Sequence, residues 1–200
     1  DALYHAAHQT MEELSADPKH LGARIGYICV LHTWGSRMNY HPHLHTIVLG
    51  GGLDAANKWK DKGKKFFFPV KVMSAVFKKY YLCELKQLWE EKKLEYHGTA
   101  AHLKNHYEFK VLLNSLYDKN WVVYTKEAFN GADSVIRYLG RYTHRIAISN
   151  RRIVSMTDET VTYLVKDYKN GGKYIEQTIK GTEFCLLYTS PSPRDKRQSR

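Results

Sequence analysis

The chain has 200 residues, of which 43% are apolar and 13% aromatic, so it is long enough to bury one hydrophobic core of ordinary domain size. Its 31 Lys and Arg residues outnumber the 20 Asp and Glu residues, and the net charge of +11 favours a polyanionic partner such as nucleic acid. No apolar run approaches the roughly 20 residues of a membrane-spanning helix, and three cysteines without a CxxC pair indicate a reducing, cytoplasmic setting rather than a disulfide-stabilised scaffold.

The two ends of the chain differ in character from its centre. The first residue is Asp1 rather than Met, so we expect the chain to be a fragment. From Cys185 onward Pro, Ser and charged residues replace the apolar pattern, and little of this segment can be buried. We therefore predict one domain over residues 1–184 and a non-native or disordered tail over residues 185–200.

Hydrophobic periodicity divides the first half of the chain into helices and a β-hairpin. Sparse apolar anchors predict a helix within residues 1–24. Residues 25–31 and 43–49 are rich in β-branched and aromatic side chains, which predicts two antiparallel strands that end at Gly50-Gly51-Gly52. The following segments are a basic loop (58–65), a short strand or anchor (66–70), and a helix capped by Ser74 with apolar positions Phe77, Tyr81, Leu85 and Leu88.

The second half of the chain is predicted to contain two more helices and several strands. We expect a helix over 101–117, a strand over 121–125, a helix from 131 to about 143, and a β meander over 145–183 with turns at 150–151, 158–159 and 170–172. Because most neighbouring strands are connected as hairpins, the predicted class is α+β, with a central antiparallel sheet and flanking helices.

The first motif with chemical content is His41-Pro-His-Leu-His45. In a strand, residues two apart point to the same side, so His43 and His45 project together while Leu44 points into the core. Two imidazoles at this separation could bind one divalent ion. A chance pair on a polar sheet face would have the same spacing, so spacing alone does not decide between these interpretations.

The second motif is Tyr138-Leu-Gly-Arg-Tyr142, on the helix predicted from residue 131. At about 100° per residue, both phenols share one flank with the guanidinium groups of Arg141 and Arg145. A separate face of the same helix carries apolar side chains. Tyrosine pairs at this spacing also occur at the edges of hydrophobic cores, so the motif is ambiguous by itself.

Together the two motifs supply the parts of a phosphoryl-transfer site. A phenol has a pKa near 10 and is a poor nucleophile at neutral pH, so its attack on a phosphate requires a cation that offsets the developing charge. The histidine pair could bind such a cation, and arginines beside the tyrosines could bind phosphates through two parallel hydrogen bonds.

These motifs resemble those of a known enzyme family, the two-tyrosine HUH transposases of rolling-circle insertion sequences. The matching blocks are Leu31-His-Thr-Trp-Gly35, the His41–His45 motif with its following glycines, Trp121-Val-Val-Tyr124, and the run from Tyr138 to Asn150. The resemblance covers residues 2–184. It implies an HUH-endonuclease-like fold and a DNA transposase domain. Such a domain nicks and rejoins single-stranded DNA at transposon ends through 5′-phosphotyrosine intermediates.

The resemblance also assigns roles to individual residues. Tyr138 and Tyr142 correspond to the paired nucleophiles, and His43 and His45 to ligands of a divalent metal ion, Mg²⁺ or Mn²⁺. The third ligand stays open. A hairpin that turns near residues 37–38 would place His32 opposite His43, and the alternatives are His41 and His144. The side chains expected to bind DNA are those of Arg137, Arg141, Arg145, Lys64 and Lys65, and the expected location is the bacterial cytoplasm, at the nucleoid.

Three alternatives compete with this interpretation. A rolling-circle replication initiator or a relaxase would share the histidine pair, but the Thr143–Asn150 block favours the transposase. A barrel-type metal hydrolase also uses paired histidines, but that fold needs about 250 residues. From another class, a non-catalytic basic module that binds single-stranded DNA needs only basic and aromatic side chains, and it would form no covalent adduct.

Overall fold

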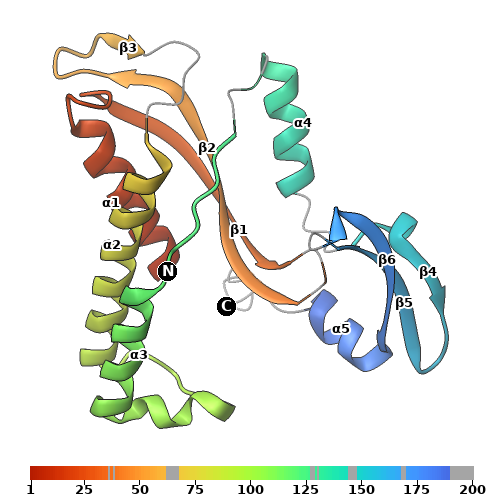
Figure 1. The fold of residues 1–200 in the computed structure, drawn as a ribbon. Helices are drawn as coiled ribbons and strands as arrows, with labels where there is room; N and C mark the ends of the chain where they lie inside the picture. Colours follow the sequence, from red (N-terminus) through yellow and green to blue (C-terminus); the bar gives the residue numbers. More distant parts are fainter. Residues whose placement is uncertain are drawn as a thin grey trace, which may run out of the picture. The chain divides into compact units, whose positions relative to one another are not determined.

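The structure is a computed structural model that describes residues 1–35, 37, 39–61, 68–126, 129, 131–143, 148–167 and 170–189, with the backbone alone at residues 132, 141–143 and 186–189. In chain order its elements (Figure 1) are α1 (Ala2–Ala16), β1 (Arg24–Trp34), β2 (Tyr40–Leu53), β3 (Trp59–Asp61), α2 (Val70–Glu90), the 3₁₀ helix η1 (Gly98–Lys104), α3 (His106–Asp118), α4 (Ala132–Thr143), the 3₁₀ helix η2 (Asn150–Arg152), β4 (Ile153–Met156), β5 (Thr160–Asp167), β6 (Lys173–Lys180) and α5 (Gly181–Thr189).

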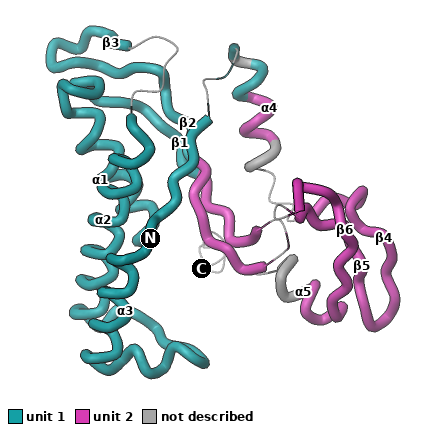
Figure 2. Tube along the Cα trace, in the orientation of Figure 1, with its two compact units in different colours: residues 1–29, 46–135 teal, residues 30–45, 136–200 magenta. Residues whose placement is uncertain are grey.

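The described strands form two three-stranded sheets, in the orders β1-β2-β3 and β4-β5-β6. Strands β2 and β3 pair antiparallel, as do the neighbours within the second sheet. The predicted α+β class, with antiparallel sheets and flanking helices, is confirmed. The pattern of contacts within the chain divides it into two compact units (Figure 2). The first unit contains residues 1–29 and 46–135, and the second contains residues 30–45 and 136–200.

In the first unit, helices α1 and α2 lie side by side (Figure 1) and build the core together with the beginning of β1. Met11 and Leu14 of α1, Ile25 of β1 and Met73 of α2 are buried together, with Leu21 fully buried among them. Their burial supplies the apolar stabilisation of this unit.

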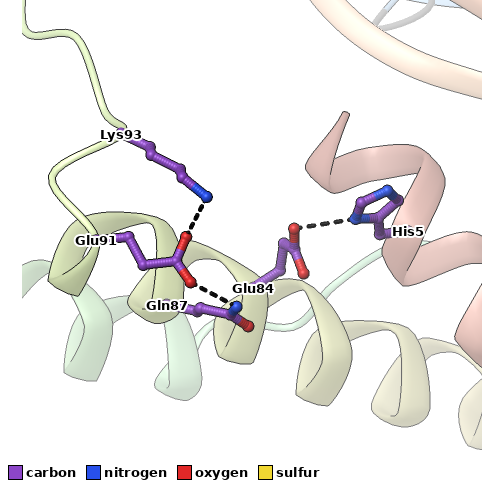
Figure 3. A network of polar contacts seen from close by, with 5 residues as sticks. All are labelled: His5, Glu84, Gln87, Glu91 and Lys93. Carbon is purple, nitrogen blue, oxygen red and sulfur yellow. Dashed lines mark hydrogen bonds and ion pairs between the residues drawn. The ribbon is translucent and has the colours of Figure 1, made fainter.

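Polar contacts line the solvent side of the same helix pair. The His5 Nδ1 of α1 lies 3.1 Å from the Glu84 Oε1 of α2, and the Gln87 amide donates to Glu91, which also pairs with Lys93 (Figure 3). Exposed pairs of this kind contribute little to stability, so the apolar core holds the two helices together.

The predicted hairpin is present, but its second strand is longer than expected. Strand β2 continues through the three glycines to Leu53 and pairs with β3, which occupies the start of the predicted basic loop. The turn forms because the Asp54 carboxylate accepts hydrogen bonds from the backbone N–H groups of Ala56 and Lys58. Residues 62–67 of the basic loop lie outside the described residues.

Gly52 is required by a close approach of two backbones. A Cβ atom at Gly52 would lie 2.3 Å from the carbonyl oxygen of Arg24, whereas a Cβ atom at Gly50 would meet nothing within 4 Å. We expect Gly52→Ala to lower the free energy of unfolding by about 1–3 kcal/mol through overpacking, with Gly50→Ala as the matched control that leaves it nearly unchanged. Urea unfolding of the two variants measures the difference, and equal midpoints would contradict the packing argument.

The predicted strand over 121–125 is wrong, because this segment is not part of any strand. Its position is determined by side chains instead. The Trp121 ring packs on Phe77 and Tyr81, at centroid distances of 6.0 and 5.3 Å, and its carbonyl accepts a hydrogen bond from the Ser74 hydroxyl. Ser74 is therefore not a helix cap, as α2 already begins at Val70.

The helix predicted over 101–117 is two helices, η1 and α3. Asn105 separates them with an extended backbone, and its side-chain oxygen accepts from the N–H groups of Tyr107 and Glu108. Because this side chain caps α3, the chain starts a new helix here instead of continuing the previous one.

The second unit contains the β4-β5-β6 sheet, so the meander predicted over 145–183 is present over residues 153–180, with its turns at 158–159 and 170–172. The segment predicted as a turn at 150–151 is part of the 3₁₀ helix η2. Every second residue of β5 is buried, and Val161, Tyr163 and Val165 pack with Ile148 and Phe184. Phe184 belongs to α5, a helix absent from the predicted elements, which crosses the domain boundary predicted at residue 184. Residues 190–200 lie outside the described residues.

Candidate active site

Three histidines converge where β1 and β2 run side by side in the second unit. His32 comes from β1, and His43 and His45 come from β2. One ring nitrogen from each lies within 4.8 Å of the other two, and in the described part of the chain this is the only group of three or more His, Cys, Asp or Glu residues close enough to bind one metal ion. The alternation of the strand and the pairing of the hairpin explain this convergence.

The spacing of the nitrogens fits a metal ion. The Nε2 atoms of His43 and His45 are 3.1 Å apart. Two nitrogen ligands that each lie about 2.0–2.1 Å from one ion are separated by about 2.9–3.4 Å. His41 is exposed and contributes its carbonyl oxygen to the Nδ1 of His43, at 2.7 Å, and His144, the other alternative ligand, lies outside the described residues.

The surroundings keep the imidazoles of His43 and His45 neutral. Burial, together with the nearby His32 and His43, lowers the pKa of His45 to about 4. Burial also lowers the pKa of His43, although the hydrogen bond to the His41 carbonyl opposes this shift. A neutral imidazole has one nitrogen lone pair, so at pH 7 the rings of His43 and His45 can bind a cation without a net loss of protons.

The hydroxyl of Tyr138 lies at the histidine cluster. Its oxygen is 3.1 Å from the Nδ1 of His45, on the other side of the ring from the Nε2 that faces His43. Helix α4 carries Tyr138, and its bounds confirm the predicted helix. The structure thus brings together four of the five residues predicted as metal ligands or nucleophiles: His32, His43, His45 and Tyr138.

The roles of these four residues stay predictions, as do those of the remaining predicted site residues. Position 142 lies on α4 one turn after Tyr138, but its side chain and that of Arg141 are outside the described atoms. Arg137 is exposed on the same helix. Arg145, Lys64 and Lys65 lie outside the described residues.

Comparison with known proteins identifies the family of the chain. A sequence profile of the family described as "Putative transposase" matches residues 26–190. The chain belongs to this transposase family. The resemblance to transposases inferred from the sequence is thereby confirmed.

Two relatives of this transposase-family chain bear related names. It is 39% identical over 193 residues to "Putative transposase y4qJ" of Sinorhizobium fredii. This match covers 94% of this chain and 48% of that protein. It is 27% identical over 195 residues to "Transposase for insertion sequence element IS801" of Pseudomonas savastanoi pv. phaseolicola, which covers 96% of this chain and 45% of that protein. The chain thus spans about half the length of these curated relatives. No solved structure matches it.

Two contacts of this transposase-family chain, one at the histidine cluster and one near the tip of the hairpin, were not predicted from the sequence. The Trp34 ring stacks on His32, with centroids 5.4 Å apart and planes 10° from parallel. Near the tip of the hairpin, Arg37 pairs with the buried Asp167 of β5 at 2.7 Å. The first contact follows from the two-residue spacing within β1 and could have been predicted. The second joins residues 130 positions apart and had no sequence signal.

In the described part of the chain, none of the helices has the length and apolar character that crossing a membrane requires. This finding agrees with the absence of a long apolar run in the sequence.

Proposed function

We propose that this chain is the DNA-cleaving core of a transposase, which nicks and rejoins single-stranded DNA through a 5′-phosphotyrosine intermediate in rolling-circle transposition. One observation carries the proposal: the Tyr138 hydroxyl lies 3.1 Å from His45, a member of the histidine cluster. A tyrosine that merely packs against the sheet would not need its hydroxyl at the neutral imidazole of His45.

His32, His43 and His45 are the proposed ligands of a divalent cation, which when bound polarises the scissile phosphate and offsets the charge that develops on it. Three imidazoles are unusual ligands for Mg²⁺ and suit softer ions better, so we expect Mn²⁺ to support activity at least as well. The lowered pKa of His43 and His45 keeps these ligands neutral at the pH of the cell.

Tyr138 is the proposed nucleophile. Its phenol oxygen attacks the phosphorus, a bond from this oxygen to the phosphorus forms, and the bond from phosphorus to the 3′ oxygen breaks. The phenol proton passes to solvent and the departing 3′ oxygen takes up a proton, so the strand ends in a free 3′ hydroxyl. Attack by a 3′ hydroxyl on the phosphotyrosine reverses these steps and rejoins DNA without an external energy source.

Two further groups complete the proposal. Tyr142, one helical turn after Tyr138, would cut a second strand while the first stays joined to the protein. The exposed Arg137, together with Arg141, Arg145, Lys64 and Lys65, would bind the phosphates on either side of the cleaved bond, because guanidinium and ammonium groups neutralise the backbone charge.

The experiment is to incubate the protein with a pool of single-stranded oligonucleotides of random sequence and Mn²⁺ or Mg²⁺, in two versions labelled at the 5′ or the 3′ end. We expect a protein–DNA band on a denaturing gel that carries only the 3′-end label, because the 5′ phosphate of the downstream fragment is joined to the tyrosine. Binding without a covalent band would instead indicate the non-catalytic DNA-binding module. A band with the 5′-end label would contradict the proposed polarity.

A further inference from the structure

The hydrogen bonds of the histidine cluster determine where its protons lie. The Nδ1 of His43 is 2.7 Å from the carbonyl oxygen of His41. A carbonyl oxygen only accepts, so this Nδ1 must carry a proton. A neutral imidazole has one N–H group, so the Nε2 of His43 has a lone pair and no proton.

The proton of His45 follows from that of His43. Their Nε2 atoms are 3.1 Å apart, and one of the two must donate. Because the Nε2 of His43 has no proton, the Nε2 of His45 donates. The Nδ1 of His45 then has the lone pair, and it accepts the hydroxyl proton of Tyr138 at 3.1 Å. In the metal-free protein Tyr138 is therefore a hydrogen-bond donor to His45.

A cation changes the requirement at His45 and leaves His43 as it is. His43 already presents the Nε2 lone pair that a ligand needs. For His45 to present the same atom, its proton must leave Nε2 and reside on Nδ1, which faces Tyr138. The ring stays neutral, since solvent takes one proton from Nε2 and returns one to Nδ1.

We propose that His45 is a positioning residue whose tautomer couples the metal site to Tyr138: cation binding reverses the hydrogen bond between them. The Nδ1–H group of His45 then donates to the Tyr138 oxygen, and the hydroxyl group of Tyr138 turns its own proton toward solvent. The oxygen that is to attack phosphorus thus receives a hydrogen bond that favours negative charge on it. This inference rests on the proposed function for the roles of the cation and Tyr138.

The reversed hydrogen bond between His45 and Tyr138 explains why the tyrosine would react only when a cation is bound to the histidines. Without a cation, the hydroxyl proton of Tyr138 is held by the Nδ1 lone pair of His45. With a cation, that lone pair no longer exists. His43 cannot act in this way, because its Nδ1 is committed to the carbonyl of His41 in both states.

The test is nitrogen-15 NMR of the histidine rings in the full chain, without metal and with Zn²⁺ alone as a diamagnetic probe. We expect His45 to change from the Nε2–H to the Nδ1–H tautomer when Zn²⁺ binds, while His43 is Nδ1–H in both states. A His45 ring that is already Nδ1–H without metal, or that stays Nε2–H with Zn²⁺ bound, would overturn the proposal. Because no DNA is present, this outcome is independent of whether the chain cleaves DNA.

A variant pair separates coupling from structure. Tyr138→Phe removes only the hydroxyl, so Zn²⁺ binding and the tautomer change of His45 should persist, while the tyrosine ultraviolet difference spectrum induced by Zn²⁺ should lose the contribution of this residue. Tyr174→Phe, at an exposed position of β6, is the matched control and should retain that contribution. Identical difference spectra for the wild type and Tyr138→Phe would show that the cation does not reach Tyr138 through His45.

Discussion

His43→Ala and His45→Ala are each expected to reduce metal-dependent DNA cleavage by about 100-fold or more, since even outer-shell partners of metal ligands are worth about 10–100-fold. Each substitution removes one of the three imidazoles that converge within 4.8 Å of one another. DNA affinity should remain close to that of the wild type, because it comes mainly from Lys and Arg. The adduct assay measures cleavage, and a gel shift measures DNA affinity. Calorimetric titration measures how strongly each variant binds Mn²⁺.

His97→Ala is the control for these variants, because that side chain is 84% exposed and lies outside the cluster. It should retain cleavage and Mn²⁺ binding. Undiminished cleavage by the wild type in EDTA would contradict the metal requirement.

The pH dependence of Mn²⁺ binding follows from the same residues. Burial, with the nearby His32 and His43, lowers the pKa of His45 to about 4. A lowered pKa favours the neutral ring, so protons compete with Mn²⁺ at His45 only as the pH falls toward 4. We therefore expect binding to stay nearly constant from pH 8 to pH 7 and to weaken in acid. The histidine substitutions should abolish this acid limb together with the binding itself.

The double substitution of Tyr138 and Tyr142 by Phe is expected to abolish the covalent DNA adduct completely. Phe preserves the ring and removes only the hydroxyl that would attack phosphorus. For Tyr138 the substitution also removes the hydrogen bond to His45, which should change the free energy of unfolding by only about 0.5–1.5 kcal/mol. A denaturing gel for the adduct and urea unfolding for stability distinguish lost chemistry from lost folding.

The single variants report how the two tyrosines divide the reaction. We expect either that Tyr138→Phe and Tyr142→Phe both retain some nicking, or that only one of these two variants does. Tyr174→Phe serves again as the exposed control and should form the adduct at the wild-type level. If the double variant still forms a denaturant-stable adduct, the nucleophile lies elsewhere in the chain.

Local periodicity in the sequence was enough to predict much of the candidate site. The two-residue alternation of a strand placed His43 and His45 on one side, and a turn near residues 37–38 would place His32 opposite His43. The structure shows this proximity. It likewise shows α4 at the predicted position of the helix that carries Tyr138. These features depend on residues that are close together in the chain, and the local sequence pattern is enough to predict them.

Predictions failed where the local structure was inferred from residue type alone and a distant residue in contact with it decided the outcome. Residues 121–125 have strand-forming side chains, but β-propensity describes packing on a sheet surface, and here Trp121 packs on Phe77 and Tyr81 of α2 instead. Ser74 is a good helix cap by type, yet its hydroxyl donates to the Trp121 carbonyl. In both cases a contact with a residue 40 to 47 positions away along the chain overrode the local preference.

The sequence by itself thus determined the fold class, the family and the residues from which a site could be built. Only the tertiary structure decided which atoms face each other. The Arg37–Asp167 pair near the hairpin tip and the hydroxyl of Tyr138 at the Nδ1 of His45 join residues 130 and 93 positions apart. No periodicity extends over such separations, because these contacts exist only after the chain has folded and brought distant elements within hydrogen-bonding distance.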